Sequence, residues 1–180
     1  MVKESGHNWE IWRGIISDTE ASLAAREVET LLKQRQDWLV VTEFPFFRAS
    51  TVRGTTRCDI LQWPEADSGV AVLKAIAGQL AEVTGDVSGR AIINVYAPRG
   101  VIGRHRDNEG IAGAPLEDTT LAVGLVGMAE VAIEDAEGFK GKFQLGPTDA
   151  LHLRNPRSTS ERAWHSFRNI GNNKRIGLVD

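Results

Sequence analysis

The chain has 180 residues, the length of one domain, and its 42% hydrophobic and 25% charged residues are typical of a folded globular protein. The formal net charge of −3 argues against strong nonspecific binding to duplex nucleic acid, although it permits a local basic patch. The single cysteine, Cys58, excludes an internal disulfide and a cysteine-based zinc cage. The sequence has no apolar run long enough to span a membrane and no secretory signal after Met1. We therefore expect a cytoplasmic protein without membrane contact.

Two amphipathic helices are predicted in the first half of the chain. From Asp18 to Gln36, apolar residues recur at helical spacing behind an acidic first turn, with Asp18 as a candidate N-cap. A second helix is predicted from Val70 to Val83, and Gly85 would end it.

After Gly89 the pattern changes to short apolar segments separated by turn residues, which predicts strands. Helices followed by many closely spaced strands favour an α+β domain, with the helices packed outside a sandwich or barrel of strands. The sequence shows no repeat or linker, so we expect residues 1–180 to form one domain. The predicted strands are Ala91–Tyr96, Leu121–Leu125, Glu130–Ile133, Lys142–Leu145, Ala150–Leu153, Trp164–Arg168 and Arg175–Val179.

His105 is the most informative of the four histidines, because Asp107 follows two residues later. On an extended backbone, residues i and i+2 point to the same side, so both side chains can bind one metal ion. A second histidine from elsewhere would complete a facial triad, which leaves positions on Fe(II) open for a cosubstrate and oxygen. By itself, His-x-Asp is a weak signal, and a solvated loop with a salt-bridged histidine is the commoner explanation.

The residues around His105 strengthen the metal hypothesis. The segment 93–109 is INVYAPRGVIGRHRDNE, and Asn155-Pro156 and Trp164-His165-Ser166 follow further along the chain. This arrangement resembles the AlkB family of Fe(II)- and 2-oxoglutarate-dependent dioxygenases, in which Asn-x-Tyr and a glycine-containing turn precede His-x-Asp. The resemblance extends over residues 91–179, about half of the chain, and residues 102–109 are especially similar to animal members that repair DNA.

The resemblance implies a double-stranded β-helix, or jelly roll, in which two facing antiparallel sheets hold the iron between them. Residues 91–180 would form this β core, and residues 1–90 would supply outer helices and a substrate-covering lid. A guanidinium group would hold the distal carboxylate of 2-oxoglutarate. The implied ligands are His105, Asp107 and His165 for Fe(II), and Asn94, Tyr96 and Arg175 for 2-oxoglutarate. Taken singly, the last three are also common as polar residues on a sheet surface.

His152 competes with His165 for the place of the third metal ligand. Each histidine is followed ten residues later by an arginine, Arg162 after His152 and Arg175 after His165. Arg162 belongs to the polar segment 157–162, which predicts a loop, whereas Arg175 opens an apolar strand. We therefore favour His165 and expect His152 to lie on the sheet, satisfied by neighbours or water.

The C-terminal segment departs from the family pattern. The family has a second arginine six positions after the first, which neutralises the carboxylate of 2-oxoglutarate next to the metal, but the chain ends before that position. Gly177 stands where the family has asparagine. Either the chain is truncated, or Arg168, Arg106 or Arg154 substitutes for the second arginine, or the cosubstrate binds weakly.

Three residues are candidates for substrate contact. Glu109 matches a position where family members place an acidic residue near the target base, although a solvated loop carboxylate explains it equally well. Phe47 and Arg53 belong to the segment 44–57, which mixes aromatic residues with arginines at the position of the family's lid. Stacking and phosphate contact are what a flipped or single-stranded nucleotide requires. The alternative is a pair of strands with a core-facing phenylalanine and solvated arginines.

The sequence thus predicts an Fe(II)- and 2-oxoglutarate-dependent dioxygenase with no catalytic residues beyond the metal ligands. We expect repair-type oxidative demethylation of N-alkylated bases in single-stranded or short DNA or RNA, releasing succinate, CO2 and formaldehyde. We further expect a monomer without an obligate protein partner. Two alternatives stay open: the same chemistry on a small molecule, a free nucleotide or a protein side chain, and a non-catalytic AlkB-like binding protein.

Overall fold

The computed structural model describes residues 2–34, 39–42, 52–60, 71–84, 91–107 and 119–179. No helix in these ranges is long and apolar enough to cross a membrane. In chain order the elements are β1 (Val2–Gly6), β2 (Trp9–Arg13), α1 (Asp18–Gln34), β3 (Leu39–Thr42), β4 (Val52–Ile60), α2 (Ala71–Thr84), β5 (Ala91–His105), β6 (Thr119–Val126), β7 (Ala129–Glu134), β8 (Lys140–Leu145), β9 (Ala150–Arg154), the 3-10 turn η3 (Thr159–Glu161), β10 (Trp164–Asn169) and β11 (Arg175–Val179).

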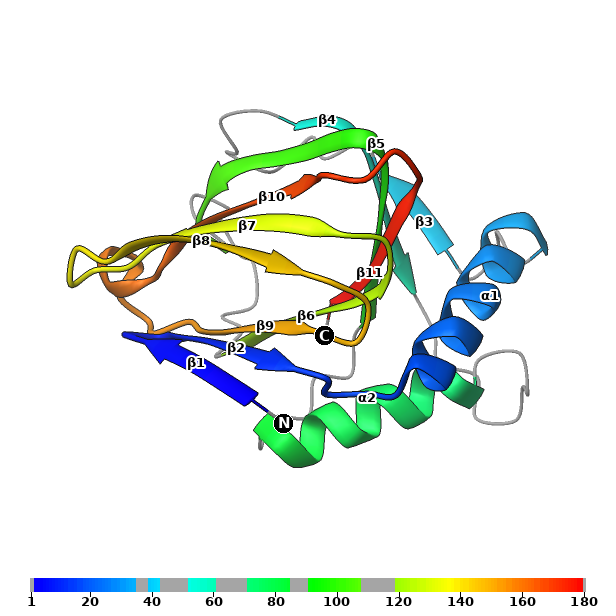
Figure 1. Ribbon diagram of the computed structural model, residues 1–180, viewed down its shortest axis with the longest axis horizontal. Coiled ribbons are helices and arrows are strands. Elements are labelled where there is room, and N and C mark those ends of the chain that lie inside the picture. Colours follow the sequence, from blue (N-terminus) through cyan, green and yellow to red (C-terminus); the bar gives the residue numbers. More distant parts are fainter. Residues whose placement is uncertain are drawn as a thin grey trace.

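The strands form a curled antiparallel sheet whose two halves are joined through the long strand β5 (Figure 1). Hydrogen-bonded neighbours follow the order β1-β2-β9-β6-β11-β5-β10-β7-β8, and β4 pairs with both β3 and β5. The first part of β5 pairs with β11, where Tyr96 lies opposite Arg175, and its last part pairs with β10, where His105 lies opposite His165. This is the jelly-roll arrangement predicted from the sequence, so that prediction is confirmed.

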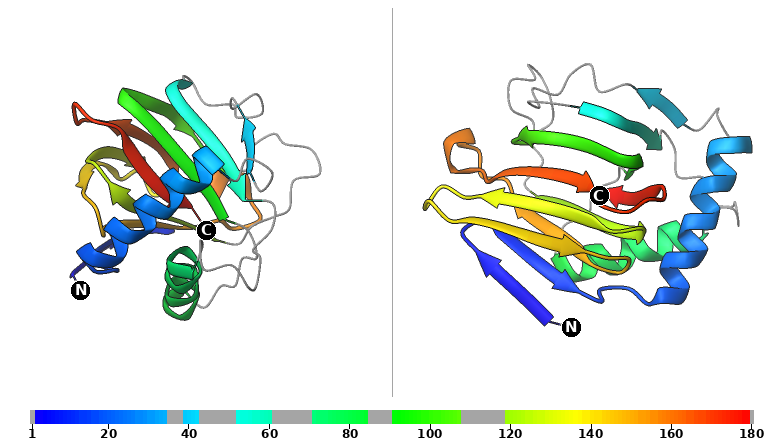
Figure 2. Two further views of the ribbon diagram at one scale, coloured as in Figure 1. Left: turned by 90° about the vertical axis from the view of Figure 1, so that its right-hand side faces the viewer. Right: turned by 45° about the horizontal axis from the view of Figure 1, so that its top comes forward.

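Two apolar clusters lie on opposite faces of the same strands. Because strand side chains alternate between faces, Ile176 and Leu178 of β11 pack toward the helices, while Arg175 and Gly177 point between the two halves of the sheet. The helices lie outside the sheet (Figure 2). The outer cluster includes Val28, Leu31, Leu73, Ile76, Leu80, Leu121, Val123, Ile176 and Leu178, and the inner one includes Trp9, Ile11, Tyr96, Ile102, Val131, Ile133, Leu151, Leu153 and Phe167.

The predicted helices and strands occur close to where the sequence pattern placed them, and there are three differences. β3 and β4 were not among the predicted strands, although a pair of strands in the segment 44–57 was the alternative to a substrate lid. β5 was expected to end at Tyr96 but continues to His105, because pairing with β4 and β10 satisfies its backbone beyond Pro98. The hairpin of β1 and β2 was not predicted. β2 buries both of its faces, from Trp9 to Trp12, so the polar–apolar alternation that marks a half-exposed strand is missing there.

Candidate metal centre

His105, Asp107 and His165 lie close together at one end of the inner space. His105 ends β5, Asp107 follows two residues later, and His165 is opposite His105 on β10. His105 Nε2 is 3.7 Å from Asp107 Oδ1, and His165 Nε2 is 3.5 Å from the same oxygen. One possible ligand atom from each residue lies within 4.8 Å of the other two, and all three residues are buried. Among the residues that the structure describes, this is the one group of three or more that could hold a metal ion.

The imidazole rings are oriented by backbone carbonyls. Nδ1 of His105 lies 2.8 Å from the carbonyl oxygen of Gly103, and Nδ1 of His165 lies 3.5 Å from that of Ala163. If Nδ1–H donates to the carbonyl, the lone pair of each Nε2 is directed toward Asp107. A ligating histidine in metal sites is usually held in this way through its second nitrogen.

The electrostatics of the group favour the protonation states that a metal requires. Burial lowers the pKa of His105 to about 4, and the neighbouring His165 acts in the same direction, so the imidazole of His105 is neutral at pH 7. Burial would raise the pKa of Asp107, but the two histidines and the hydroxyl of Thr120 hold it well below its usual range. A metal ion binds neutral imidazole and ionised carboxylate. His105 and Asp107 therefore do not have to lose a proton before they bind a metal ion.

The carboxylate of Asp107 still has capacity for a ligand. Thr120 is hydrogen-bonded to this carboxylate, and Asn155 Nδ2 in turn donates to Thr120 Oγ1 at 2.8 Å. Asp107 Oδ2 is nevertheless buried without a hydrogen-bond partner. Two imidazoles and one carboxylate converging from one side match the donor set of non-haem Fe(II) sites, so the residues fit that metal.

A second polar group lies further along the inner face, around Arg175. The guanidinium carbon of Arg175 is 5.0 Å from the ring centre of Tyr96 and 5.6 Å from that of Phe167, which contacts His165 edge-on. Tyr96 is hydrogen-bonded to Arg175 and to Asn94, and burial raises the pKa of its hydroxyl. Burial lowers the pKa of Arg175, but a guanidinium stays charged in proteins. Arg175 Nε and Asn94 Oδ1 are buried without hydrogen-bond partners, which fits the binding of a polar, anionic molecule.

Gly177 explains how the guanidinium of Arg175 fits between the sheets. Gly177 lies opposite Asn94 and next to Arg175 on the inner face of β11. A Cβ at this position would lie 3.2 Å from Arg175 Nη1 and 3.3 Å from the carbonyl oxygen of Val123. The glycine therefore leaves the room that the arginine side chain occupies.

The three arginines considered as substitutes for the family's second arginine have other surroundings. Arg168 is exposed on β10, and Arg154 forms an ion pair with Glu10. The guanidinium of Arg106 lies 4.3 Å from the ring centre of Trp164. These contacts therefore do not support the idea that one of the three takes the role of the family's second arginine.

His152 lies in a different polar cluster. Its Nδ1 is 3.2 Å from Glu10 Oε2, and its ring meets Trp12 edge-on at 5.8 Å. The carboxylate of Glu10 also accepts hydrogen bonds from Trp12 at 3.0 Å, Lys3 at 2.7 Å and Arg154 at 3.1 Å. This cluster ties β1 and β2 to β9, so geometry brings His165, and not His152, to His105.

We expect the Glu10 cluster to make the protein acid-sensitive. Burial would raise the pKa of Glu10, but its donors lower it from 4.5 to about 2. A carboxyl group with a depressed pKa stabilises the fold above its unfolded pKa, and this contribution is lost as the pH falls from about 4.5 toward 2. Glu10→Gln should therefore lower the free energy of unfolding at pH 7 by about 2–3 kcal/mol.

Urea unfolding at several pH values tests this prediction. Between pH 5 and 3 the free energy of unfolding should fall less steeply in Glu10→Gln than in the wild-type protein. Glu137→Gln is the matched control, because the exposed carboxylate of Glu137 is ion-paired only with the partly exposed His7 among the described residues. Equal pH slopes for wild type and Glu10→Gln would show that Glu10 is not the responsible group.

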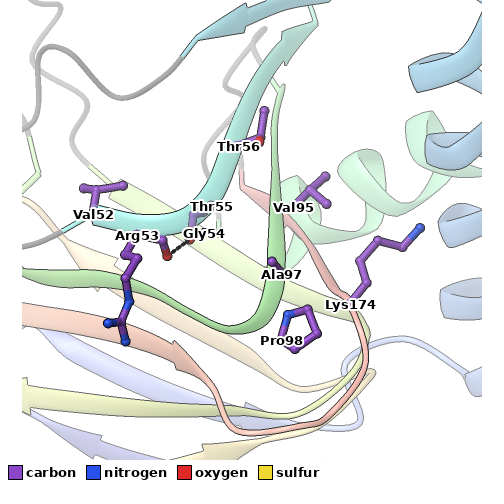
Figure 3. Close-up of a pocket in the computed structure, with 9 residues that line it drawn as sticks. All are labelled: Val52, Arg53, Gly54, Thr55, Thr56, Val95, Ala97, Pro98 and Lys174. Atoms are coloured by element: carbon purple, nitrogen blue, oxygen red, sulfur yellow. Dashed lines mark hydrogen bonds between the residues drawn. The ribbon is translucent and has the colours of Figure 1, made fainter.

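Two of the three predicted substrate contacts, Phe47 and Glu109, lie outside the described residues, so their roles stay predictions. Arg53 is exposed and lines a surface hollow of about 780 Å³ formed by β4, β5 and the loop before β11 (Figure 3). Its neighbour Val52 pairs with Ile102 of the inner cluster, so Arg53 points to the outer face of the sheet. A substrate that contacts Arg53 would therefore do so outside the space that holds the triad.

No family model matches the sequence, and no curated protein is detectably similar to it. Solved structures do match over nearly the whole chain. A Trichoplax adhaerens prolyl hydroxylase, in complex with a hypoxia inducible factor peptide fragment, has a TM-score of 0.70 at 13% identity, over 96% of this chain and 82% of that one. OsALKBH1 has a TM-score of 0.66 at 13% identity, over 98% of both chains. The non-heme alpha ketoglutarate dependent epimerase SnoN has a TM-score of 0.67 at 12% identity, over 96% and 76%.

The chain has the jelly-roll fold of 2-oxoglutarate-dependent oxygenases. At 12–13% identity these likenesses establish the fold and not the substrate. Prolyl hydroxylases, OsALKBH1 and the epimerase match about equally well, so the comparisons do not single out the AlkB family.

Proposed function

We propose that the chain is an Fe(II)- and 2-oxoglutarate-dependent oxygenase. The observation that carries this proposal is the group of His105, Asp107 and His165 at one end of the inner space of this fold. The second observation is the buried Arg175, whose guanidinium lies near the ring of Phe167, and that ring also contacts His165 edge-on. A metal-binding group and a buried cation with unpaired polar atoms nearby suit a chelating dicarboxylate.

The chain's own residues would hold, orient and shield the reactants. The three ligand atoms would hold Fe(II) from one side and leave its other side open. Arg175 would bind the distal carboxylate of 2-oxoglutarate, with Tyr96 and Asn94 as further hydrogen-bond partners. When bound, Fe(II) and 2-oxoglutarate would supply the oxidation of a substrate C–H bond by O2, coupled to conversion of 2-oxoglutarate to succinate and CO2.

Arg57 is a residue that the sequence patterns did not single out. It lies opposite Asn94 in the pairing of β4 with β5, so the two side chains share the inner face. We include Arg57 in the proposed cosubstrate site as a second positive charge. Finding it required the strand register, because the sequence pattern offered a strand in this segment only as the alternative to a substrate-covering lid.

For the substrate, the proposal is an N-alkylated base in single-stranded or short DNA or RNA. Support comes from the segment 102–109, which resembles DNA-repairing AlkB members, and from the match with OsALKBH1 over 98% of both chains. One oxygen atom of O2 would convert N–CH3 to N–CH2OH, which releases formaldehyde and leaves N–H, and the other would enter succinate.

A second candidate is hydroxylation of a protein side chain. It is favoured by the TM-score of 0.70 with the prolyl hydroxylase that was solved with a peptide fragment. The two candidates differ in their products, because hydroxylation of a ring carbon of proline retains the hydroxyl group and releases no formaldehyde.

Two measurements test the proposal in sequence. Anaerobic titration of Fe(II) into the apoprotein with saturating 2-oxoglutarate should produce a weak visible charge-transfer band, which His105→Ala should lack. No band in the wild-type protein would contradict the oxygenase proposal. Methylated oligonucleotides should then yield succinate and formaldehyde in equal amounts, whereas succinate formation driven by a proline peptide without formaldehyde would favour the second candidate.

A further inference from the structure

Arg162 lies next to the metal centre but has no place in the proposed function. The sequence pattern predicted a loop over residues 157–162, and residues 157–161 are exposed. Arg162 in the same loop is only 1% exposed, which the sequence pattern did not indicate. A fully buried arginine is rare and requires partners for its charge.

The hydrogen bonds of Arg162 connect it to the segment that carries Asp107. Its Nη1 donates to the main-chain carbonyl oxygen of Asp107 at 2.7 Å, across 55 residues of sequence. Its Nε donates to the carbonyl oxygen of Pro156 at 2.8 Å. Its Nη2 is buried without a hydrogen-bond partner, and no ion pair among the described residues involves Arg162. The guanidinium thus links the Asp107 segment to the chain just before β10.

The hydrogen bond from Arg162 to Asp107 lies beyond the last residue pair that the strands hold in place. His105 and His165 are held opposite each other by the pairing of β5 with β10. Asp107 lies two residues beyond the end of β5, so this pairing does not hold its main chain. Arg162 stands three residues before His165, and its hydrogen bond to Asp107 therefore joins the two segments that carry the three residues of the group.

We propose that Arg162 is a positioning residue of the metal centre, which holds Asp107 in place relative to His165 and so preforms the site. This inference rests on the proposed function, because it assumes that the group binds a metal ion. Loss of a hydrogen-bond partner behind a metal ligand typically lowers metal affinity about 10–100-fold. A purely electrostatic role makes the opposite prediction, because removal of a nearby positive charge should tighten the binding of a divalent cation.

Co(II) binding to the apoprotein tests the proposal without catalysis. Affinity is measured by competition with a chelator, and the visible absorption of bound Co(II) reports its coordination geometry. Arg162→Met should bind Co(II) about 10–100-fold more weakly and with an altered spectrum. Arg162→Lys should show a smaller loss, since an ammonium group can donate to Asp107 but lacks the planar fork that also reaches Pro156.

Arg13→Met is the matched control. Arg13 donates to the carbonyl oxygen of Gln144 and to Asp149, far from the metal ligands in the fold, so its loss should lower stability but leave Co(II) binding unchanged. Thermal unfolding of each apoprotein shows how much stability each variant has lost. If Arg162→Met does not fold, Arg162→Lys serves as the test.

The outcomes separate this inference from the proposed function. Co(II) affinity equal to or higher than that of the wild-type protein, in Arg162→Met or in Arg162→Lys, would overturn the positioning role while leaving the metal site intact. An equal loss of Co(II) affinity in Arg13→Met would also overturn the positioning role, because the loss of affinity would then result from lower folding stability. Failure of the wild-type protein to bind either Co(II) or Fe(II) would overturn the proposed function itself.

Discussion

Replacement of His165 with alanine should abolish the Fe(II)- and 2-oxoglutarate-dependent charge-transfer band and lower turnover by more than about 100-fold. The expected loss exceeds the roughly 10–100-fold effect of removing a residue behind a ligand, because the proposed function makes His165 itself a ligand. His165 Nε2 lies 3.5 Å from Asp107 Oδ1, and the ring centres of His165 and His105 are 4.2 Å apart. Anaerobic titration followed by visible absorption measures the band, and succinate formation measures turnover.

His152→Ala is the control for this experiment. His152 is equally buried, but its described partners are Glu10 and Trp12, away from the triad. Its replacement should lower the free energy of unfolding by about 1–3 kcal/mol, because the carboxylate of Glu10 loses a buried donor, and should preserve the band. Loss of the band in His152→Ala with retention in His165→Ala would reverse the assignment of the third ligand.

Replacement of Arg175 with methionine should weaken 2-oxoglutarate binding about 10–100-fold. Hydrogen bonds to charged groups contribute roughly 1.5–3 kcal/mol, and each 1.4 kcal/mol corresponds to a factor of ten. Metal affinity should stay within a few-fold of the wild-type value, because the ring contacts described for Arg175 are with Tyr96 and Phe167 and not with the three proposed ligands. The dissociation constant is measured by titrating 2-oxoglutarate into the Fe(II)-loaded protein under anaerobic conditions.

Arg168→Met provides the comparison for Arg175→Met. Arg168 is exposed on β10, so its removal should leave 2-oxoglutarate affinity unchanged. Equal affinities of Arg175→Met and the wild-type protein would contradict the proposed cosubstrate site. Weakened binding in Arg168→Met, in contrast, would restore Arg168 as the substitute for the family's second arginine.

Much of the architecture follows from local sequence patterns. Helical spacing of apolar residues placed α1 and α2, and short apolar segments placed β6 to β11. The spacing of His105 and Asp107 placed two candidate ligands on one side of an extended segment, since strand side chains alternate with a period of two. The similar spacing of Asn94 and Tyr96 placed them on one face of β5, which the structure shows to be the inner face. Their roles as ligands stay predictions.

Other features depended on segments that meet only in the folded protein. Strand register places His165, and not His152, beside His105, because β10 lies beside the end of β5, whereas β9 lies beside β2 and β6. The length of β5 was set by the strands on either side of it. The hairpin of β1 and β2 was missed because neither strand shows the alternation on which strand prediction depends. β2 is buried on both faces, and residues 3–6 of β1 are exposed on both.

The sequence by itself determined the types of element and the presence of the His-x-Asp pair, because both depend on dihedral preferences and spacing over a few residues. Only the tertiary structure decided which distant histidine lies beside the pair of His105 and Asp107. The burial of Arg162 against the carbonyl of Asp107 illustrates the reason. An arginine is buried only where acceptors satisfy its donors. One acceptor of Arg162, the carbonyl oxygen of Asp107, is 55 residues away in the sequence and comes close only because β5 and β10 bring the two segments together.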